Sequence, residues 1–313
     1  MKKIDIIFDC DPGHDDVVAL MTAVAHPEVF NILGITTVAG NNTLENVTNN
    51  ILSVIDHLEF DIPVYKGYAT PMRRDPSPAA GHGKTGLDGP DLKPPSSKPQ
   101  DKHALDFIYE TLISRDEPLT IVAIGPLTNI GVLFMTYPEV KEKIEKICIM
   151  GGGIYTGNIT RKSEFNLWHD PEAAKIVFRS GVPIVMSGLE VCHAGGILHT
   201  EYVKLEGRGR ASQLVFELYD FFSGNMKSKG IDWSPIYDLT TILQLLNPSI
   251  FKSEMFDIDI ETEGELCRAM TVADQRPFVK KDSLNVEVLM DVDREAYIGM
   301  LFEALDILDK RYQ

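Results

Sequence analysis

An acidic cluster near the N-terminus constrains this chain more than any other feature. Residues 4–20 read IDIIFDCDPGHDDVVAL. The apolar run at 4–8 predicts a β-strand, Pro12 and Gly13 predict a tight turn, and the amphipathic spacing after them predicts a helix. We therefore expect four carboxylates close to the end of one strand: Asp9, Asp11, Asp15 and Asp16.

Four neighbouring carboxylates favour a cation site. Carboxylates this close repel one another and retain protons unless a positive charge compensates them. Oxygen ligands without cysteine or clustered histidine favour a hard cation, so Ca²⁺ or Mg²⁺ is expected rather than zinc. The alternative is an ordinary acidic helix start, where Asp is common. Open α/β sheets bind ligands at the carboxyl ends of their strands, and for this reason we favour a site.

Length and charge limit the other possibilities. The chain has 313 residues and no Ser- or Gly-rich linker, so a single domain over 1–313 is expected. The formal net charge of −16 would repel a phosphate backbone, and we expect no nucleic-acid partner. Asp5 and Asp9 break the first apolar run too early for a signal peptide, and no stretch has transmembrane length. A cytoplasmic protein without membrane contact is the prediction.

The cysteines indicate no metal or redox pair. They are widely spaced, and three of them lie in apolar, strand-like runs. We expect reduced core residues at Cys10, Cys148, Cys192 and Cys267.

Strand-like and helical patterns alternate through most of the chain. The strand-like runs cover residues 31–40, 120–125, 146–152 and 183–190. The helical patterns cover residues 14–26, 42–58, 101–114, 127–136 and 170–180. This alternation predicts an α/β fold with a mostly parallel central sheet flanked by helices. The apolar stripe of the first helix is expected to face the sheet.

The last third of the chain has a different pattern. Residues 214–230 predict an aromatic helix, and another helix is expected from about Asp238. Alternating strands then precede an amphipathic helix at 293–310. We expect a C-terminal helical and peripheral strand region, and we assign no chemistry to the strands.

Polar residues follow each predicted strand. Asp11 follows the first, Asn41 and Asn42 the second, and residues 126–129 the third. In a parallel sheet these ends share one edge, so residues distant in sequence can meet around one ligand. The glycines at 151–153 lack the context of a GxGxxG or GK[ST] motif, so a phosphate cradle is rejected.

A polar segment after these glycines suits a sugar. Asn158, Glu164 and Asn166 offer donors and acceptors for hydroxyl groups. From the residues alone, a plain polar loop is an equal alternative. Asp170 and the following Pro form a helix start, and we treat Asp170 as structural.

Four motifs in order resemble one family. They are DCDPGHDD, VAGNNTL (38–44), IGPLTNI (124–130) and MGGGIYTGNITRKSEFNLWHDPEAA (150–174). The chain is similar to the inosine–uridine preferring nucleoside hydrolases, Ca²⁺-dependent N-ribohydrolases with a Rossmann-like fold. The similarity fades after about residue 190. The family implies a ribonucleoside substrate and a homodimer or homotetramer.

The resemblance also implies roles for individual residues. Ca²⁺ would be held by Asp11, Asp16, Asp238 and the backbone carbonyl of Ile124, with Asp11 also taking a proton from the attacking water. The ribose hydroxyls would be bound by Asp15, Asn41, Asn158, Glu164 and Asn166. Residues 70–100 are rich in Pro, Gly and Ser, and we expect a lid there because His82 and Asp88 match a family segment near the active site.

One position departs from the family pattern. The family has a His-Asp pair before the helix at about residue 238, and this chain has Tyr237-Asp238. A phenol titrates near pH 10 and is a poorer proton donor than imidazolium, so the preferred base is left open and an unusual base is possible. Tyr237, His82 and Trp233 are the candidates that face the leaving base. We expect Tyr237 mainly to pack and His82 to supply the proton.

Two other functions were weighed. Asp9 and Asp11 form a DxD pair like that of haloacid dehalogenase phosphatases, but Pro12 and Gly13 fit that motif poorly and the sugar-type segment has no use in it. A non-catalytic Ca²⁺-dependent nucleoside or ribose binder is the second alternative. Retention of Asp11 argues against it, because a binder needs no general base.

Overall fold

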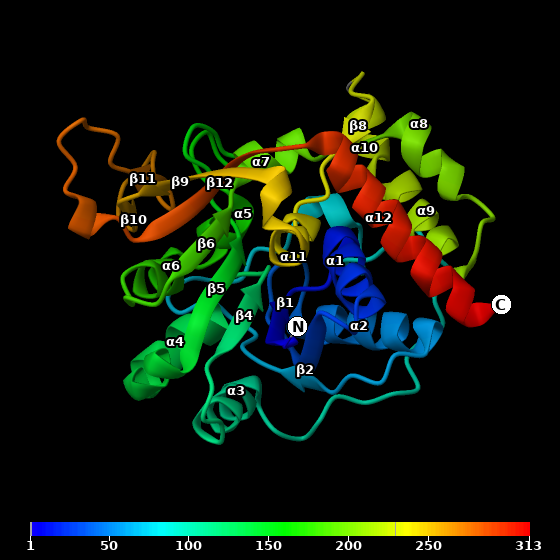
Figure 1. Cartoon of the computed structure of the whole chain (residues 1–313), viewed down its shortest axis with the longest axis horizontal. Helices are drawn as coiled ribbons and strands as arrows, with labels where there is room; N and C mark the ends of the chain where they lie inside the picture. Colours follow the sequence, from blue (N-terminus) through cyan, green and yellow to red (C-terminus); the bar gives the residue numbers. More distant parts are fainter. Residues whose placement is uncertain (1, 229) are drawn as a thin grey trace.

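A computed structural model of the chain describes residues 2–228 and 230–313. Its centre is an eight-stranded sheet of order β3-β2-β1-β4-β5-β6-β12-β9, in which only β9 runs antiparallel to its neighbour (Figure 1). The strands are β3 (Val64–Lys66), β2 (Phe30–Thr37), β1 (Ile4–Cys10), β4 (Leu119–Ala123), β5 (Ile144–Met150), β6 (Ile184–Ser187), β12 (Val286–Val292) and β9 (Phe251–Phe256). The predicted mostly parallel α/β fold is confirmed.

Helices cover both faces of the sheet. Side chains of β1 alternate between two buried clusters, with Phe8 in one and Ile7 in the other, as the two-residue period of a strand requires. The first cluster is completed by α1 (His14–Ala25), α2 (Leu44–Leu58), α9 (Arg210–Phe222), α11 (Leu239–Leu246) and α12 (Arg294–Asp309). The second is completed by α3 (Ala104–Ile113), α4 (Thr128–Thr136) and α6 (Pro171–Phe178).

Helix α1 is more enclosed than its sequence pattern predicts. All its residues except Val24 are buried, because α9, α11 and α12 pack over the side that faces away from the sheet. Figure 1 shows α12, the last long helix, lying alongside α1. The predicted stripe does face the core, but the polar first turn of α1 is buried as well.

The remaining elements are short. The short helices are α5 (Phe165–His169), α7 (Leu189–Ala194), α8 (His199–Tyr202) and α10 (Gly224–Ser228). The 3₁₀ segments are Ala80–His82, Pro138–Lys143, Val203–Leu205, Pro248–Ile250, Lys281–Ser283 and Lys310–Tyr312. Two small antiparallel pairs are β7 (Ile197–Leu198) with β8 (Trp233–Ser234), and β10 (Ile258–Ile260) with β11 (Thr271–Ala273). In the described part of the chain, no helix is long and apolar enough to cross a membrane.

Three sequence expectations need correction. The strand β12 is not peripheral: it pairs with β6 in parallel inside the main sheet, and of the described strands after residue 250 only β10 and β11 lie outside that sheet. The helix predicted at 214–230 is divided into α9 and α10, and residue 229 lies outside the described residues. Cys10, Cys148 and Cys192 are buried as expected, with Cys192 in helix α7, but Cys267 is only half-buried, in the turn between β10 and β11.

Candidate active site

A cavity of about 410 Å³ lies at the edge of the sheet where β4 and β5 end. Its lining contains nine of the residues predicted from the sequence: Asp15, Asn41, His82, Ile124, Asn158, Glu164, Asn166, Tyr237 and Asp238. Asp11 and Asp16 lie next to this lining, since Asn41 donates its backbone N–H to Asp11 at 2.6 Å and its side-chain amide to Asp16 at 3.5 Å. The parallel topology thus gathers residues from 11 to 238 at one place.

Three buried carboxylates meet beside the cavity. Asp15 and Asp16 occupy the first turn of α1, and Asp238 is the N-cap residue of α11. One oxygen of each lies within 4.8 Å of the others. The neighbouring Asp11 has a buried Oδ1 atom without a hydrogen-bond partner. Asp15, which the resemblance assigns to the sugar, is therefore part of the same cluster as the expected cation ligands Asp16 and Asp238.

Burial raises the pKa of every member of this cluster. The pKa of Asp16 rises to about 6 and that of Asp15 to about 8. The pKa values of Asp11 and Asp238 rise well above the usual range, first through burial and then through repulsion by neighbouring carboxylates. The backbone N–H groups of Gly13 and Asp11 donate hydrogen bonds to Asp16 and offset part of the rise in its pKa. A positive charge beside the cluster would therefore favour its ionised form.

The donor set fits a hard divalent cation. It consists of oxygen atoms, and the backbone carbonyl of Ile124 borders the same cavity. That carbonyl accepts a hydrogen bond from Asn166 Nδ2 at 2.8 Å and retains a second lone pair. Ca²⁺ takes about six to eight oxygen ligands, so these groups would leave positions for oxygens of a bound molecule.

Asp9 does not belong to the cluster, contrary to the sequence expectation of four neighbouring carboxylates. Its Oδ1 atom accepts hydrogen bonds from Thr36 Oγ1 at 2.5 Å and Asn129 Nδ2 at 2.7 Å. Burial outweighs these bonds and raises the pKa of Asp9 to about 7. Asp9 therefore ties β1 to β2 and α4.

The segment between β5 and α5 supplies polar groups to the cavity. Glu164 caps α5 and accepts backbone N–H groups of Asn166 at 2.9 Å and Gly152 at 3.0 Å. Asn166 also donates to the Met150 carbonyl at 3.2 Å, which leaves its side-chain oxygen for a ligand. Asn158 is exposed, and its side chain offsets part of the rise in the pKa of the nearby Tyr237 phenol. The sugar-binding residues predicted in this segment thus all line the cavity.

His82 is held against the cavity by a second histidine. Its Nδ1 atom lies 2.9 Å from His14 Nδ1, and His14 Nε2 lies 2.8 Å from the Asp88 carbonyl oxygen. The backbone N–H of His14 also donates to His82 Nδ1 at 3.4 Å. A carbonyl only accepts, so His14 Nε2 carries a proton. Burial lowers the pKa of His82 to about 3 and that of His14 to about 4. His82 is therefore neutral at pH 7 and could assist a leaving group only through a hydrogen bond, not as an imidazolium acid.

The loop at 70–100 is largely irregular and contributes Ala79, Gly81 and His82 to the lining. Asp88 has a structural role within it, because its carboxylate accepts the backbone N–H groups of Lys84 at 2.8 Å and Thr85 at 3.0 Å. The expected position of this loop beside the site is observed.

Of the residues predicted to face the leaving base, Tyr237 lies at the cavity and Trp233 does not. Tyr237 lines the cavity, and burial raises the pKa of its phenol. Trp233 is not brought to the cavity: it belongs to β8, and its ring packs edge-on against His193 with 5.6 Å between ring centroids. Asp170 is structural as expected, since it accepts from Thr128 Oγ1 at 2.7 Å.

Sequence reasoning missed several apolar lining residues. They come from the polar loop, from α5, from the end of β5 and from α10: Ile159, Phe165, Met150 and Met226. Phe165 lies between two predicted sugar-binding residues, Glu164 and Asn166, and this position is the signal by which it could have been predicted to line the cavity. The other three carry no periodic pattern that separates them from core or surface residues.

Fold and site together define an α/β protein with buried carboxylates and hydroxyl-binding groups at one cavity. The model of the inosine–uridine preferring nucleoside hydrolase family matches residues 6–299. The chain is 41% identical over 312 residues to a pyrimidine-specific ribonucleoside hydrolase, RihA, of Shewanella sp. strain MR-4, covering 98% of both chains. The RihA of Salmonella typhimurium is also 41% identical, over 96% of this chain and 98% of that protein.

Solved structures agree with the sequence matches. The purine-preferring ribonucleoside hydrolase from Gardnerella vaginalis is 27% identical, with a TM-score of 0.90 over 98% of this chain and 99% of that chain. The chain belongs to the inosine–uridine preferring nucleoside hydrolase family and is a ribonucleoside hydrolase, an enzyme that acts on N-glycosyl compounds. The phosphatase and non-catalytic alternatives are therefore set aside.

Proposed function

We propose that this enzyme hydrolyses the N-glycosidic bond of pyrimidine ribonucleosides in a Ca²⁺-dependent reaction, releasing free base and ribose. The observation that carries the proposal is the close group of Asp15, Asp16 and Asp238 beside a wall of sugar-type hydrogen-bonding residues. The names of relatives at 41% identity support the pyrimidine assignment.

Asp11 is proposed as the general base. Its Oδ2 atom is fixed by the backbone N–H of Asn41 at 2.6 Å, while its Oδ1 atom has no partner. A positioned carboxylate with one free oxygen can take a proton from a water that attacks C1′ of the ribose. The raised pKa of Asp11 increases its basicity once it is ionised.

The bound cation would act through its positive charge. Ca²⁺ held by Asp11, Asp16, Asp238 and the Ile124 carbonyl, with Asp15 alongside, would supply the positive charge that keeps these carboxylates ionised and attracts the ribose hydroxyls.

The ribose would lie against the wall formed by Asp15, Asn41, Asn158, Glu164 and Asn166. These groups orient the sugar through its hydroxyls. Cleavage develops positive charge on the ring, as in O-glycoside hydrolysis, and the surrounding carboxylates stabilise that charge. The cytoplasmic location and the homodimer or homotetramer stay predictions from the sequence.

A nucleoside panel tests the assignment. With Ca²⁺ present, we expect release of reducing sugar from uridine and cytidine at a kcat/KM at least about tenfold above that for inosine and adenosine, a difference of about 1.4 kcal/mol in transition-state binding. Equal or better cleavage of purine ribonucleosides would contradict the pyrimidine preference. Exclusive cleavage of a ribonucleoside with a modified base would instead assign an unusual base.

His82 and Tyr237 can be distinguished as groups that assist the leaving base. We expect His82→Ala to lower kcat on uridine more than Tyr237→Phe, which keeps the ring and loses only the hydroxyl. The control substrate is p-nitrophenyl riboside, whose leaving group needs no proton. A loss on both substrates would indicate a displaced loop, and a larger loss on uridine alone for Tyr237→Phe would make Tyr237 the donor.

A further inference from the structure

A small hairpin outside the main sheet contacts the wall that would hold the ribose. It is formed by β10 and β11, with Ile260 opposite Thr271, and residues 261–270 connect the two strands. Figure 1 shows it at the end of the molecule remote from α1 and α12. The sequence assigned no chemistry to this part of the chain.

The first contact is made by Thr271, which is buried. Its Oγ1 atom accepts the backbone N–H of Gly153 at 3.2 Å. Gly152 and Gly153 begin the segment that carries Asn158, and a Cβ atom on Gly152 would lie only 2.7 Å from the same Oγ1 atom. The hairpin therefore fixes the point where the sugar-binding segment leaves β5.

The second contact is made by Ser163, which is fully buried. Its hydroxyl donates to the Arg268 carbonyl at 2.5 Å, and its backbone forms an isolated antiparallel bridge with Met270. The carbonyl of Ser163 accepts the backbone N–H groups of residues 158, 159 and 160 at 3.1, 3.3 and 3.4 Å. One serine thus ties the turn that contains Asn158 to the hairpin.

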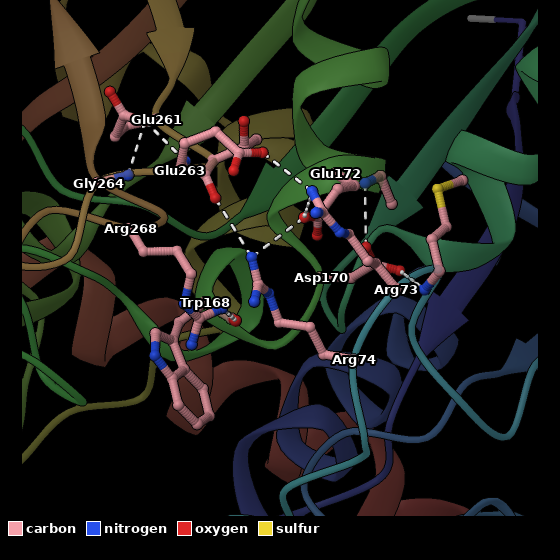
Figure 2. A network of polar contacts seen from close by, with 12 residues as sticks. Arg73, Arg74, Trp168, Asp170, Glu172, Glu261, Glu263, Gly264 and Arg268 are labelled. Carbon is pink, nitrogen blue, oxygen red and sulfur yellow. Dashed lines mark hydrogen bonds and ion pairs between the residues drawn. The ribbon is translucent and has the colours of Figure 1, made fainter.

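The third contact reaches the end of α5. The guanidinium of Arg268 lies 5.0 Å from the centre of the Trp168 ring and donates to the Trp168 carbonyl at 3.1 Å (Figure 2). Between Arg268 and Met270, Ala269 is buried and has a φ angle of +64°, a conformation that L residues rarely adopt. Such a residue persists where the surrounding contacts determine the backbone.

Ion pairs in the same region are a weaker link. Figure 2 also shows Arg73 and Arg74 near Glu172 and Glu263, and Arg73 lies 2.9 Å from Glu263. Both side chains of this pair are mostly exposed, so it contributes little. The buried contacts of Thr271 and Ser163 carry the inference.

We propose that the β10–β11 hairpin is a positioning element for ribose recognition, with Thr271 and Ser163 as positioning residues that hold Asn158 and Glu164 in register with the cavity. The inference rests on the proposed function, because it assigns the supported segment to the ribose. Neither residue lines the cavity, so each acts through the segment it supports.

The test uses Thr271→Val and Ser163→Ala in the full-length, Ca²⁺-loaded enzyme. Thr271→Val keeps the side-chain shape and leaves the buried Gly153 N–H without an acceptor. We expect the resulting displacement of the segment to raise KM for uridine about tenfold. The ratio of kcat/KM for uridine over 2′-deoxyuridine should fall by a similar factor, because a displaced segment no longer hydrogen-bonds to the sugar hydroxyls. Val272→Ala is the matched control, since Val272 lies on the same strand and is exposed.

A second readout does not depend on turnover. Amide hydrogen exchange in residues 153–163 should accelerate in Thr271→Val and Ser163→Ala and stay at the wild-type rate in Val272→Ala. Unchanged exchange, KM and ribose selectivity in both variants would overturn the positioning role, even if the wild type is a good ribonucleoside hydrolase. A wild type that releases no ribose from any nucleoside would overturn the proposed function, and the positioning role in ribose recognition with it.

Discussion

Asp11→Asn is expected to lower kcat on the best ribonucleoside by about 10² to 10⁴-fold, the usual effect of losing a general base. The amide has no basic oxygen, and it also weakens the carboxylate group that would hold the cation. The fold should persist, because an amide oxygen can still accept the Asn41 backbone N–H at the Oδ2 position. The measurements are steady-state release of reducing sugar and a thermal melt of both proteins.

Asp9→Asn is the matched control for this experiment. Asp9 lies two residues away on the same strand end and is equally buried, but its carboxylate accepts from Thr36 and Asn129, whereas that of Asp11 accepts from Asn41, which lines the cavity. We expect Asp9→Asn to retain activity within a small factor of that of the wild type. Near-wild-type turnover by Asp11→Asn would refute the mechanism, and equal losses in both variants would point to a general effect of the strand.

Removal of Ca²⁺ should destabilise the protein strongly. A ligand at 100 times its Kd adds about 2.7 kcal/mol to the free energy of unfolding. For a chain of this size that corresponds to a fall of roughly 5 °C in Tm when a chelator is added. Activity should be lost with the metal and return with Ca²⁺ more fully than with Mg²⁺. An unchanged Tm together with activity in excess chelator would remove the metal from the mechanism.

The effect of the chelator should grow with pH. In the metal-free protein the pKa values of Asp16 and Asp15 are raised to about 6 and about 8, above the value of 3.8 for an unfolded Asp. The folded state therefore binds more protons than the unfolded state, and its stability decreases as the pH rises from about 4 to about 8. A bound cation stabilises the ionised carboxylates and cancels this loss. A chelator effect on Tm that is the same at pH 5.5 and pH 8 would contradict this linkage.

The parts of the fold and site that the sequence predicted share a physical cause. A strand, a turn and a helix start are determined locally, so the placement of Asp11, Asp15 and Asp16 followed from the pattern of residues 4–20. Parallel strands end at one edge, which brought Asn41 and Ile124 to the same cavity.

The parts that the sequence did not predict depend on pairings between distant segments. Nothing local distinguishes β12 from a peripheral strand, and only its pairing with β6 places it inside the sheet. Trp233 is four residues from Tyr237, yet pairing between β8 and β7 takes its ring to His193 instead of the cavity. The apolar lining residue Met226 lies in a short helix with no periodic signal.

The enclosure of α1 has a consequence for how the chain is made. Helix α1 is synthesised before two helices that pack over it, α11 and α12, which come from residues 239–246 and 294–309. Until these two helices are synthesised, the apolar residues of α1 lack part of their cover, and such surfaces bind chaperones or aggregate. Arg311, just after α12, adds a hydrogen bond to the Val24 carbonyl of α1 at 2.9 Å. The acidic motif at residues 9–16 is thus covered by segments that follow it by more than 200 residues in the chain.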